Sequence, residues 1–120
     1  MKPGQRRWST LPALLLFLVA CGCARSGDYR PVAVASPDNQ WVVVASVNES
    51  EADPSTYLCL QIEIRQADGV VVYREQTSAS ARLNWSIAWP DDGTVHLDSS
   101  DIGDLYWERQ ADGSWQRAER

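Results

Sequence analysis

Apolar and polar residues alternate along most of the chain after residue 30. Residues 58–65 read LCLQIEIR and residues 83–89 read LNWSIAW, so every second side chain is large and apolar. A period of two places successive side chains on opposite faces of a β-strand, one toward a core and one toward water. Residues 41–47, WVVVASV, are apolar on both faces apart from Ser46, which is typical of a central strand. No stretch after residue 20 has a convincing helical spacing.

Turn-forming residues separate these strand-like runs. Asp-Gly pairs occur at residues 68–69, 92–93 and 112–113, and a fourth turn is Ser36-Pro37-Asp38-Asn39. Asp-Gly is favoured in two-residue type I′ turns, in which both central residues have positive φ. The sequence therefore predicts four successive hairpins, with strands at 31–36, 40–48, 57–66, 70–76, 83–90, 94–98, 104–111 and 114–118.

One pentapeptide, RQADG, occurs at residues 65–69 and again at 109–113. That spacing is about one blade of a β-propeller, and residues 36–41, SPDNQW, resemble the SPDG-x-W openings of repeats in TolB-like periplasmic proteins. Two blades cannot close a propeller, which takes about four or more. We therefore expect one type of hairpin turn to use the same residues twice. The predicted fold class is all-β: an antiparallel, hairpin-built sandwich or partly open barrel of about seven to eight strands.

The first twenty residues follow a different pattern. Lys2, Arg6 and Arg7 precede an apolar run at residues 11–20. This run is too short to cross a bilayer, which takes about 20 apolar residues. A basic start, a short apolar middle and small residues at its end are typical of a secretory signal peptide. We expect residues 1–20 to be the signal peptide, 21–30 a flexible tether and 31–118 one all-β domain.

The end of the apolar run, Leu18-Val19-Ala20-Cys21, resembles a bacterial lipobox. In lipoproteins with this motif the peptide is cut just before the cysteine, whose thiol carries a diacylglyceryl group. The resemblance implies lipidation at Cys21, with palmitate-type chains that hold the protein on a membrane of the cell envelope. Because Gly22 rather than Asp follows, it implies the outer membrane, facing the periplasm, in a Gram-negative host. A plain secreted protein cut near Ala24 and an uncleaved anchor are the alternatives.

The remaining chain is similar to short, uncharacterised bacterial lipoprotein domains. These open with SPD and a strand, and carry a W-x-I-x-W-x-D-D segment, here residues 85–92. The resemblance implies a fold and a location but no activity.

Charge excludes one class of partner. The whole chain has 11 basic and 16 acidic residues, and three of the basic ones lie in residues 1–20, so residues 21–120 carry a formal charge of 8 minus 16, or −8. Nucleic-acid binding needs Lys and Arg to displace phosphate counterions, so we expect no nucleic acid as a partner. The chain would also be repelled by anionic lipids, so its contact with the membrane should depend on the covalent anchor.

Cysteines and acids offer two further candidate sites. If Cys21 carries lipid, Cys23 and Cys59 remain, and an exported protein can oxidise them to a disulfide; two free thiols are the alternative. Asp98, Asp101 and Asp104 follow one another at three-residue intervals, and Ca²⁺ prefers several oxygen ligands. The competing interpretation is a polar turn, and apart from this Ca²⁺ alternative we expect no cofactor.

Five tryptophans follow residue 20, many for a domain of this size. They could fill the core of a ~90-residue domain, or one or two could be exposed and stack on a sugar ring or a partner peptide. Trp115 and Trp107 are the candidate ligand-binding residues. Trp115 is expected to be the more exposed, because it lies beside the polar C-terminal residues.

Catalysis has little support in the sequence. A hydrolytic nucleophile needs an adjacent base, and His96, the single histidine, lies in mid-strand on the face opposite Val95 and Leu97. We therefore expect a solvent-side histidine and assign no catalytic residue. The leading hypothesis is a lipid-anchored binding or structural accessory module that contacts another envelope protein or wall glycan. A small envelope enzyme or enzyme inhibitor, and a Ca²⁺-stabilised secreted domain, are the alternatives.

Overall fold

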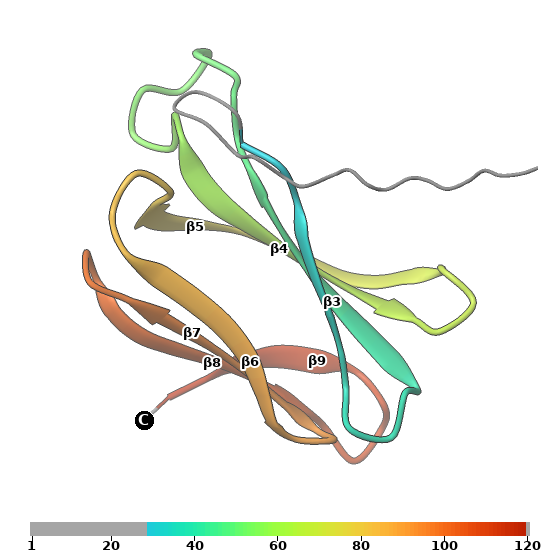
Figure 1. Ribbon diagram of the computed structural model, residues 1–120. Helices are drawn as coiled ribbons and strands as arrows, with labels where there is room; N and C mark the ends of the chain where they lie inside the picture. The colour runs from blue at the N-terminus through green and yellow to red at the C-terminus, as the bar shows by residue number, and fades with distance from the viewer. Residues whose placement is uncertain (1–28, 120) are drawn as a thin grey trace, which may run out of the picture.

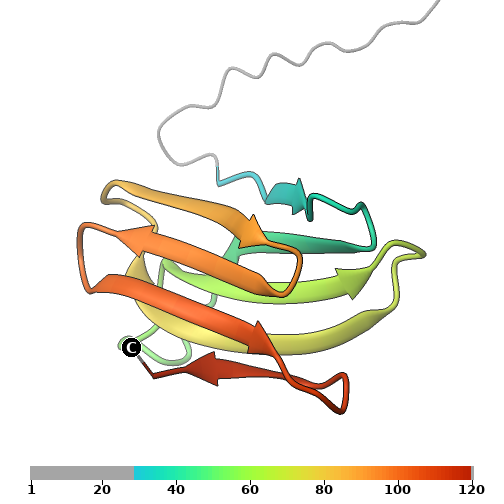
Figure 2. The same ribbon diagram turned by 90° about the horizontal axis from the view of Figure 1, so that it is seen from below.

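The alternating residues form two four-stranded antiparallel β-sheets (Figures 1 and 2). The computed structural model describes residues 29–119, and no helix occurs among them. The first sheet has the order β2-β3-β4-β5 and the second the order β6-β7-β8-β9. The strands are β2 (Val32–Ala35), β3 (Trp41–Val47), β4 (Cys59–Gln66), β5 (Val71–Ser80), β6 (Trp85–Asp91), β7 (Thr94–Ser99), β8 (Gly103–Arg109) and β9 (Trp115–Ala118).

The prediction of an all-β hairpin-built fold is confirmed, and of its two forms the structure takes the sandwich. Each sheet is a meander in which successive strands pair, and the two sheets lie face to face without closing into a barrel (Figure 2). The predicted fourth strand, 70–76, is longer than expected, since β5 continues to Ser80.

Register brings the apolar half of each strand to the inner face of its sheet. Val43 lies opposite Ile64 between β3 and β4, and Val95 lies opposite Trp107 between β7 and β8. The buried core draws on both sheets and consists of Val43, Ala45, Leu60, Ile62, Ile64, Ala79, Trp89, Val95, Leu97, Trp107 and Trp115. The core is therefore the layer between the two sheets, as the period of two requires.

The hairpin turns lie where the sequence places them, but they are not type I′. Among the Asp-Gly residues only Gly69 and Gly113 have positive φ, at 97° and 89°. In both copies of RQADG the glycine N–H donates to the glutamine carbonyl three residues earlier, at 2.9 Å. This is the geometry of a type I turn followed by one left-handed residue, which needs a single glycine rather than two residues with positive φ. The repeated pentapeptide thus forms the same turn twice.

The sandwich has two different ends. The four hairpin turns, at residues 36–40, 67–70, 92–93 and 110–114, lie together at what we call the turn end. The longer connections 48–58, 81–84 and 100–102 lie at the opposite loop end. The described chain enters beside the loop end, since β2 starts there and runs toward the turn end (Figure 1). Surfaces near residue 29 and surfaces at the hairpin turns therefore face opposite ways.

Replacement of Gly69 by alanine should destabilise the fold by about 1 kcal/mol, because an L-residue is strained at a φ of 97° although space for its Cβ is open. Gly93→Ala is the matched control. Its φ is not in the left-handed region and its Cβ would lie 3.9 Å from the nearest atom, so we expect a change within about 0.5 kcal/mol. Urea unfolding followed by tryptophan fluorescence measures both, and equal losses would contradict the turn assignment.

Candidate functional site

A glutamate lies on the inner, otherwise apolar face of the first sheet. Glu75 follows Tyr73 by two residues on edge strand β5, so both side chains point between the sheets, opposite Ile62 and Ile64 of β4. A charged group at this position breaks the apolar side of the period-two pattern. This break in the pattern is the sequence signal that points to Glu75. Glu75 is not among the candidate residues predicted from the sequence.

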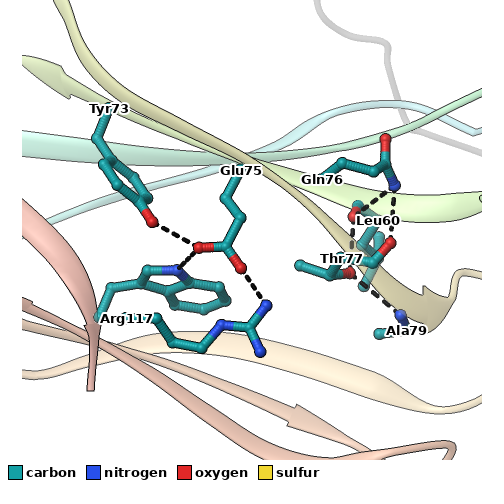
Figure 3. A network of polar contacts seen from close by, with 8 residues as sticks. Leu60, Tyr73, Glu75, Gln76, Thr77, Ala79 and Arg117 are labelled. Atoms are coloured by element: carbon teal, nitrogen blue, oxygen red, sulfur yellow. Dashed lines mark hydrogen bonds and ion pairs between the residues drawn. The ribbon is translucent and has the colours of Figure 1, made fainter. Parts of the chain in front are cut away.

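Three side chains converge on the Glu75 carboxylate (Figure 3). The Tyr73 hydroxyl donates to Oε1 at 2.5 Å, and the indole Nε1 of Trp107 donates to the same oxygen at 2.8 Å. The Arg117 guanidinium donates to Oε2. Trp107 and Arg117 come from β8 and β9, so this carboxylate joins the two sheets.

Burial alone would raise the pKa of Glu75, but the hydrogen bonds from Tyr73, Trp107 and Arg117 outweigh it and hold the pKa below its ordinary value of 4.5. The opposite effect acts on its neighbour, because burial and the adjacent carboxylate raise the pKa of Tyr73 to about 12. Both groups are therefore fixed in one protonation state at neutral pH, the glutamate ionised and the tyrosine neutral. With both carboxylate oxygens occupied by protein donors, this arrangement suits a structural tie between the sheets rather than proton transfer to a ligand.

A second polar side chain, that of Thr77, bonds backbone groups where the pairing of β5 with β4 is irregular. The register between β4 and β5 shifts between Cys59 and Gln61, which leaves residues of β5 without regular ladder partners. The buried Thr77 hydroxyl donates to the Leu60 carbonyl at 2.7 Å and accepts from the Ala79 N–H at 3.1 Å (Figure 3). The Thr77 side chain thus replaces ladder hydrogen bonds at a β-bulge.

Both tryptophans singled out as ligand-binding candidates lie in the core. Trp107 is fully buried and Trp115 is 5% exposed. The expectation that Trp115 is exposed is wrong, because its pairing with Arg109 places it on the inner face of the second sheet. Its ring meets those of Trp41 and Trp89 edge to face, with centroids 5.7 and 5.8 Å apart. The alternative interpretation, that tryptophans fill the core, describes both residues.

The three aspartates proposed as Ca²⁺ ligands do not converge on one point. Asp101 accepts the Ser80 N–H at 2.9 Å and so ties the end of β5 to the 100–102 loop. Asp98 and Asp104 lie opposite each other on the outer face of β7 and β8, and Asp104 also binds His96. Within residues 29–119, no group of three or more His, Cys, Asp or Glu side chains is arranged to hold a metal ion.

His96 lies on the outer face of the second sheet and is partly exposed. Its Nε2 is 3.0 Å from Asp104 Oδ1, and its ring stacks on Tyr106 with centroids 4.5 Å apart. The histidine thus has a carboxylate partner, one of the two parts of a catalytic pair. In the described part of the chain, His96 has no hydroxyl or thiol bonded to its ring, so a nucleophile is not part of this arrangement.

Cys59 is a buried free thiol at the start of β4, and burial raises its pKa. Its predicted disulfide partner Cys23, the lipidation residue Cys21, the signal peptide 1–20 and most of the tether 21–30 lie outside the described residues.

The 48–58 connection contains one strained residue. Leu58 has a φ of 60°, which is rare for a branched apolar side chain and costs about 1 kcal/mol or more. Two hydrogen bonds hold it there: its N–H donates to the Asn48 carbonyl at 2.7 Å, and its carbonyl accepts the Ala81 N–H at 2.9 Å. The loop end is therefore built to a defined shape.

No known protein family, curated protein or solved structure matches this chain. Residues 29–119 contain no helix with the length and apolarity needed to cross a membrane.

Replacement of Glu75 by glutamine should destabilise the domain by about 2 kcal/mol at neutral pH. The buried Trp107 indole, the half-buried Tyr73 hydroxyl and the exposed Arg117 guanidinium would all lose an ionised acceptor. Since the pKa of Glu75 is lowered by folding, its ionised form stabilises the protein above about pH 4.5, and that contribution is lost as pH falls through the folded-state pKa. The variant should therefore lose stability less steeply in acid than the parent.

Urea unfolding across this pH range measures both effects. Glu63→Gln is the control: Glu63 lies on the outer face of the same sheet and pairs with the exposed Arg65 and Arg74, so we expect a change below about 1 kcal/mol. A Glu75→Gln variant as stable as the parent at neutral pH would show that the sheets do not depend on this tie.

Proposed function

We propose that this chain is a lipid-anchored accessory module of a bacterial cell envelope that works by contact with another envelope protein. One observation carries the proposal: the lipobox-like Leu18-Val19-Ala20-Cys21, after a basic and an apolar segment, precedes by only ten residues a sandwich that starts at Val32. Acyl chains contribute about 0.8 kcal/mol per buried CH₂, so two or three of them hold a small domain at a bilayer.

The exposed side chains favour a protein partner over wall glycan. A sugar ring is bound by stacking on an exposed aromatic ring, and the two tryptophans considered for that role are buried. In contrast, Val70, Val71 and Val72 are exposed in succession at the turn end, with Val70 54% exposed. A run of exposed apolar side chains is typical of a protein contact surface.

Cys21→Ser should release the protein from the membrane fraction of a bacterium that processes lipoproteins, and should abolish incorporation of labelled palmitate. Cys23→Ser is the matched control, because it removes a thiol two residues away and leaves the lipobox intact; this variant should stay membrane-bound. Cell fractionation and mass spectrometry of the mature N-terminus measure the result. A Cys21→Ser protein that still sediments with membranes would refute the anchor.

A photoreactive residue in place of Val72 should crosslink to a discrete protein in intact cells, because this position belongs to the run of exposed valines at the turn end. The same residue at position 116, which is exposed on the second sheet, serves as the control. Crosslinking of equal yield and identity from both positions would show that the valines are not the contact surface.

A further inference from the structure

Three connections at the loop end are hydrogen-bonded into one surface. The Ala81 N–H donates to the Leu58 carbonyl at 2.9 Å, which joins the 81–84 and 48–58 connections. The Ser100 N–H donates to the Asn84 carbonyl at 3.0 Å, which joins 81–84 to 100–102. Because backbone groups make these bonds, the three connections hold fixed positions relative to one another.

Each of these connections exposes one large apolar side chain. Leu83 is 50% exposed, and Tyr57 and Ile102 are each 40% exposed. Tyr57 is held beside the strained Leu58, whose backbone is bonded on both sides. Residues of this kind, apolar side chains together with a tyrosine, are those that enter the boundary between lipid headgroups and acyl chains.

The anchor cysteine is close to this surface along the chain. The described chain enters beside the loop end, where β2 starts opposite the last residues of β3 (Figure 1). Eight residue steps separate Cys21 from Tyr29, the first described residue. Eight residues span at most about 28 Å even when fully extended. A lipid on Cys21 therefore keeps the start of the described chain, beside the loop end, within about 28 Å of the bilayer. The exposed valines lie at the other end of the sandwich.

We infer that the loop-end surface formed by Tyr57, Leu83 and Ile102 rests in the headgroup region of the bilayer that holds Cys21. The inference depends on the proposed function, because without the anchor nothing brings this end to a membrane. It adds an orientation: the sandwich stands on its loop end and presents the turn end away from the membrane.

Charge determines which lipids fit. Glu49, Glu51 and Asp53 are exposed in the 48–58 connection, which also carries Tyr57. Carboxylates at the loop end are repelled by anionic headgroups, so the surface suits zwitterionic lipid. Phosphatidylcholine vesicles are accordingly the probe.

The experiment uses the full lipidated protein with Cys23→Ser and Cys59→Ala, so that one added cysteine can carry an environment-sensitive fluorophore. The label is placed in turn by Leu83→Cys, Ile102→Cys or Val70→Cys; the last is the matched control, an exposed apolar position at the turn end. In vesicles, iodide quenching should be about fivefold weaker at positions 83 and 102 than at 70, as expected for side chains at headgroup depth. Nitroxide-labelled lipids should quench the labels at 83 and 102 only.

Each outcome separates the anchor from the orientation. Protein that does not float with vesicles refutes the anchor and this inference with it. Protein that floats but shows equal iodide quenching at 70, 83 and 102 refutes the orientation and leaves the anchor intact. Protection at 83 and 102 that is already complete without vesicles identifies a second copy as the occupant and refutes lipid contact.

Discussion

The structure depends on burying the inner faces of two small sheets against each other. Neither sheet has a helix to cover it in the described chain, so the layer between them is the whole core. Five indoles contribute to it: Trp89, Trp107 and Trp115 are buried, and Trp41 and Trp85 are partly buried against them. An aromatic side chain buries 150–250 Å², so each well-buried indole contributes about 4–6 kcal/mol of transfer free energy as an upper bound. A domain this small has few other sources of comparable stabilisation.

Indoles in a core bring a polar group with them, and this explains the charged residues between the sheets. Trp89 Nε1 donates to the Val34 carbonyl on edge strand β2 at 2.8 Å. Trp107 Nε1 needs an acceptor on the opposite side of the sandwich, which Glu75 supplies, and the ionised Glu75 in turn requires Arg117. Trp115 Nε1 is buried and has no hydrogen-bond partner among residues 29–119; its ring is held by edge-to-face contacts with two neighbouring indoles. Hydrogen bonds from tryptophan thus join the two sheets on both sides of the sandwich: from β6 to β2 on one side and from β8 to β5 on the other.

The period of two was enough to predict the strands and most of the core, because alternation fixes which side chains share a face. It does not give the conformation of a turn. The Asp-Gly pair is compatible with a type I′ turn. However, the Asp68 carboxylate accepts the Val70 N–H at 3.0 Å, and this local bond is compatible with Asp68 in the right-handed and Gly69 in the left-handed backbone conformation. Burial of Trp115 depends on its packing against Trp41 and Trp89, and the Glu75 tie depends on which sheet edges meet. These are contacts between distant residues, on which local patterns carry no information.

The number of strands in each sheet determines how the domain can be attached. A meander with an even number of strands begins and ends at the same end. At the loop end, therefore, β2 starts and β5 leads into β6, and β9 also runs back toward this end. Register shifts interrupt edge strands β5 and β6, and Pro90 removes one N–H donor from β6, which discourages addition of a foreign strand. The attachment proposed for the N-terminal segment would occupy the loop end and leave the turn end free. Contacts with the proposed partner would then fall to side chains at the turn end rather than to a sheet edge.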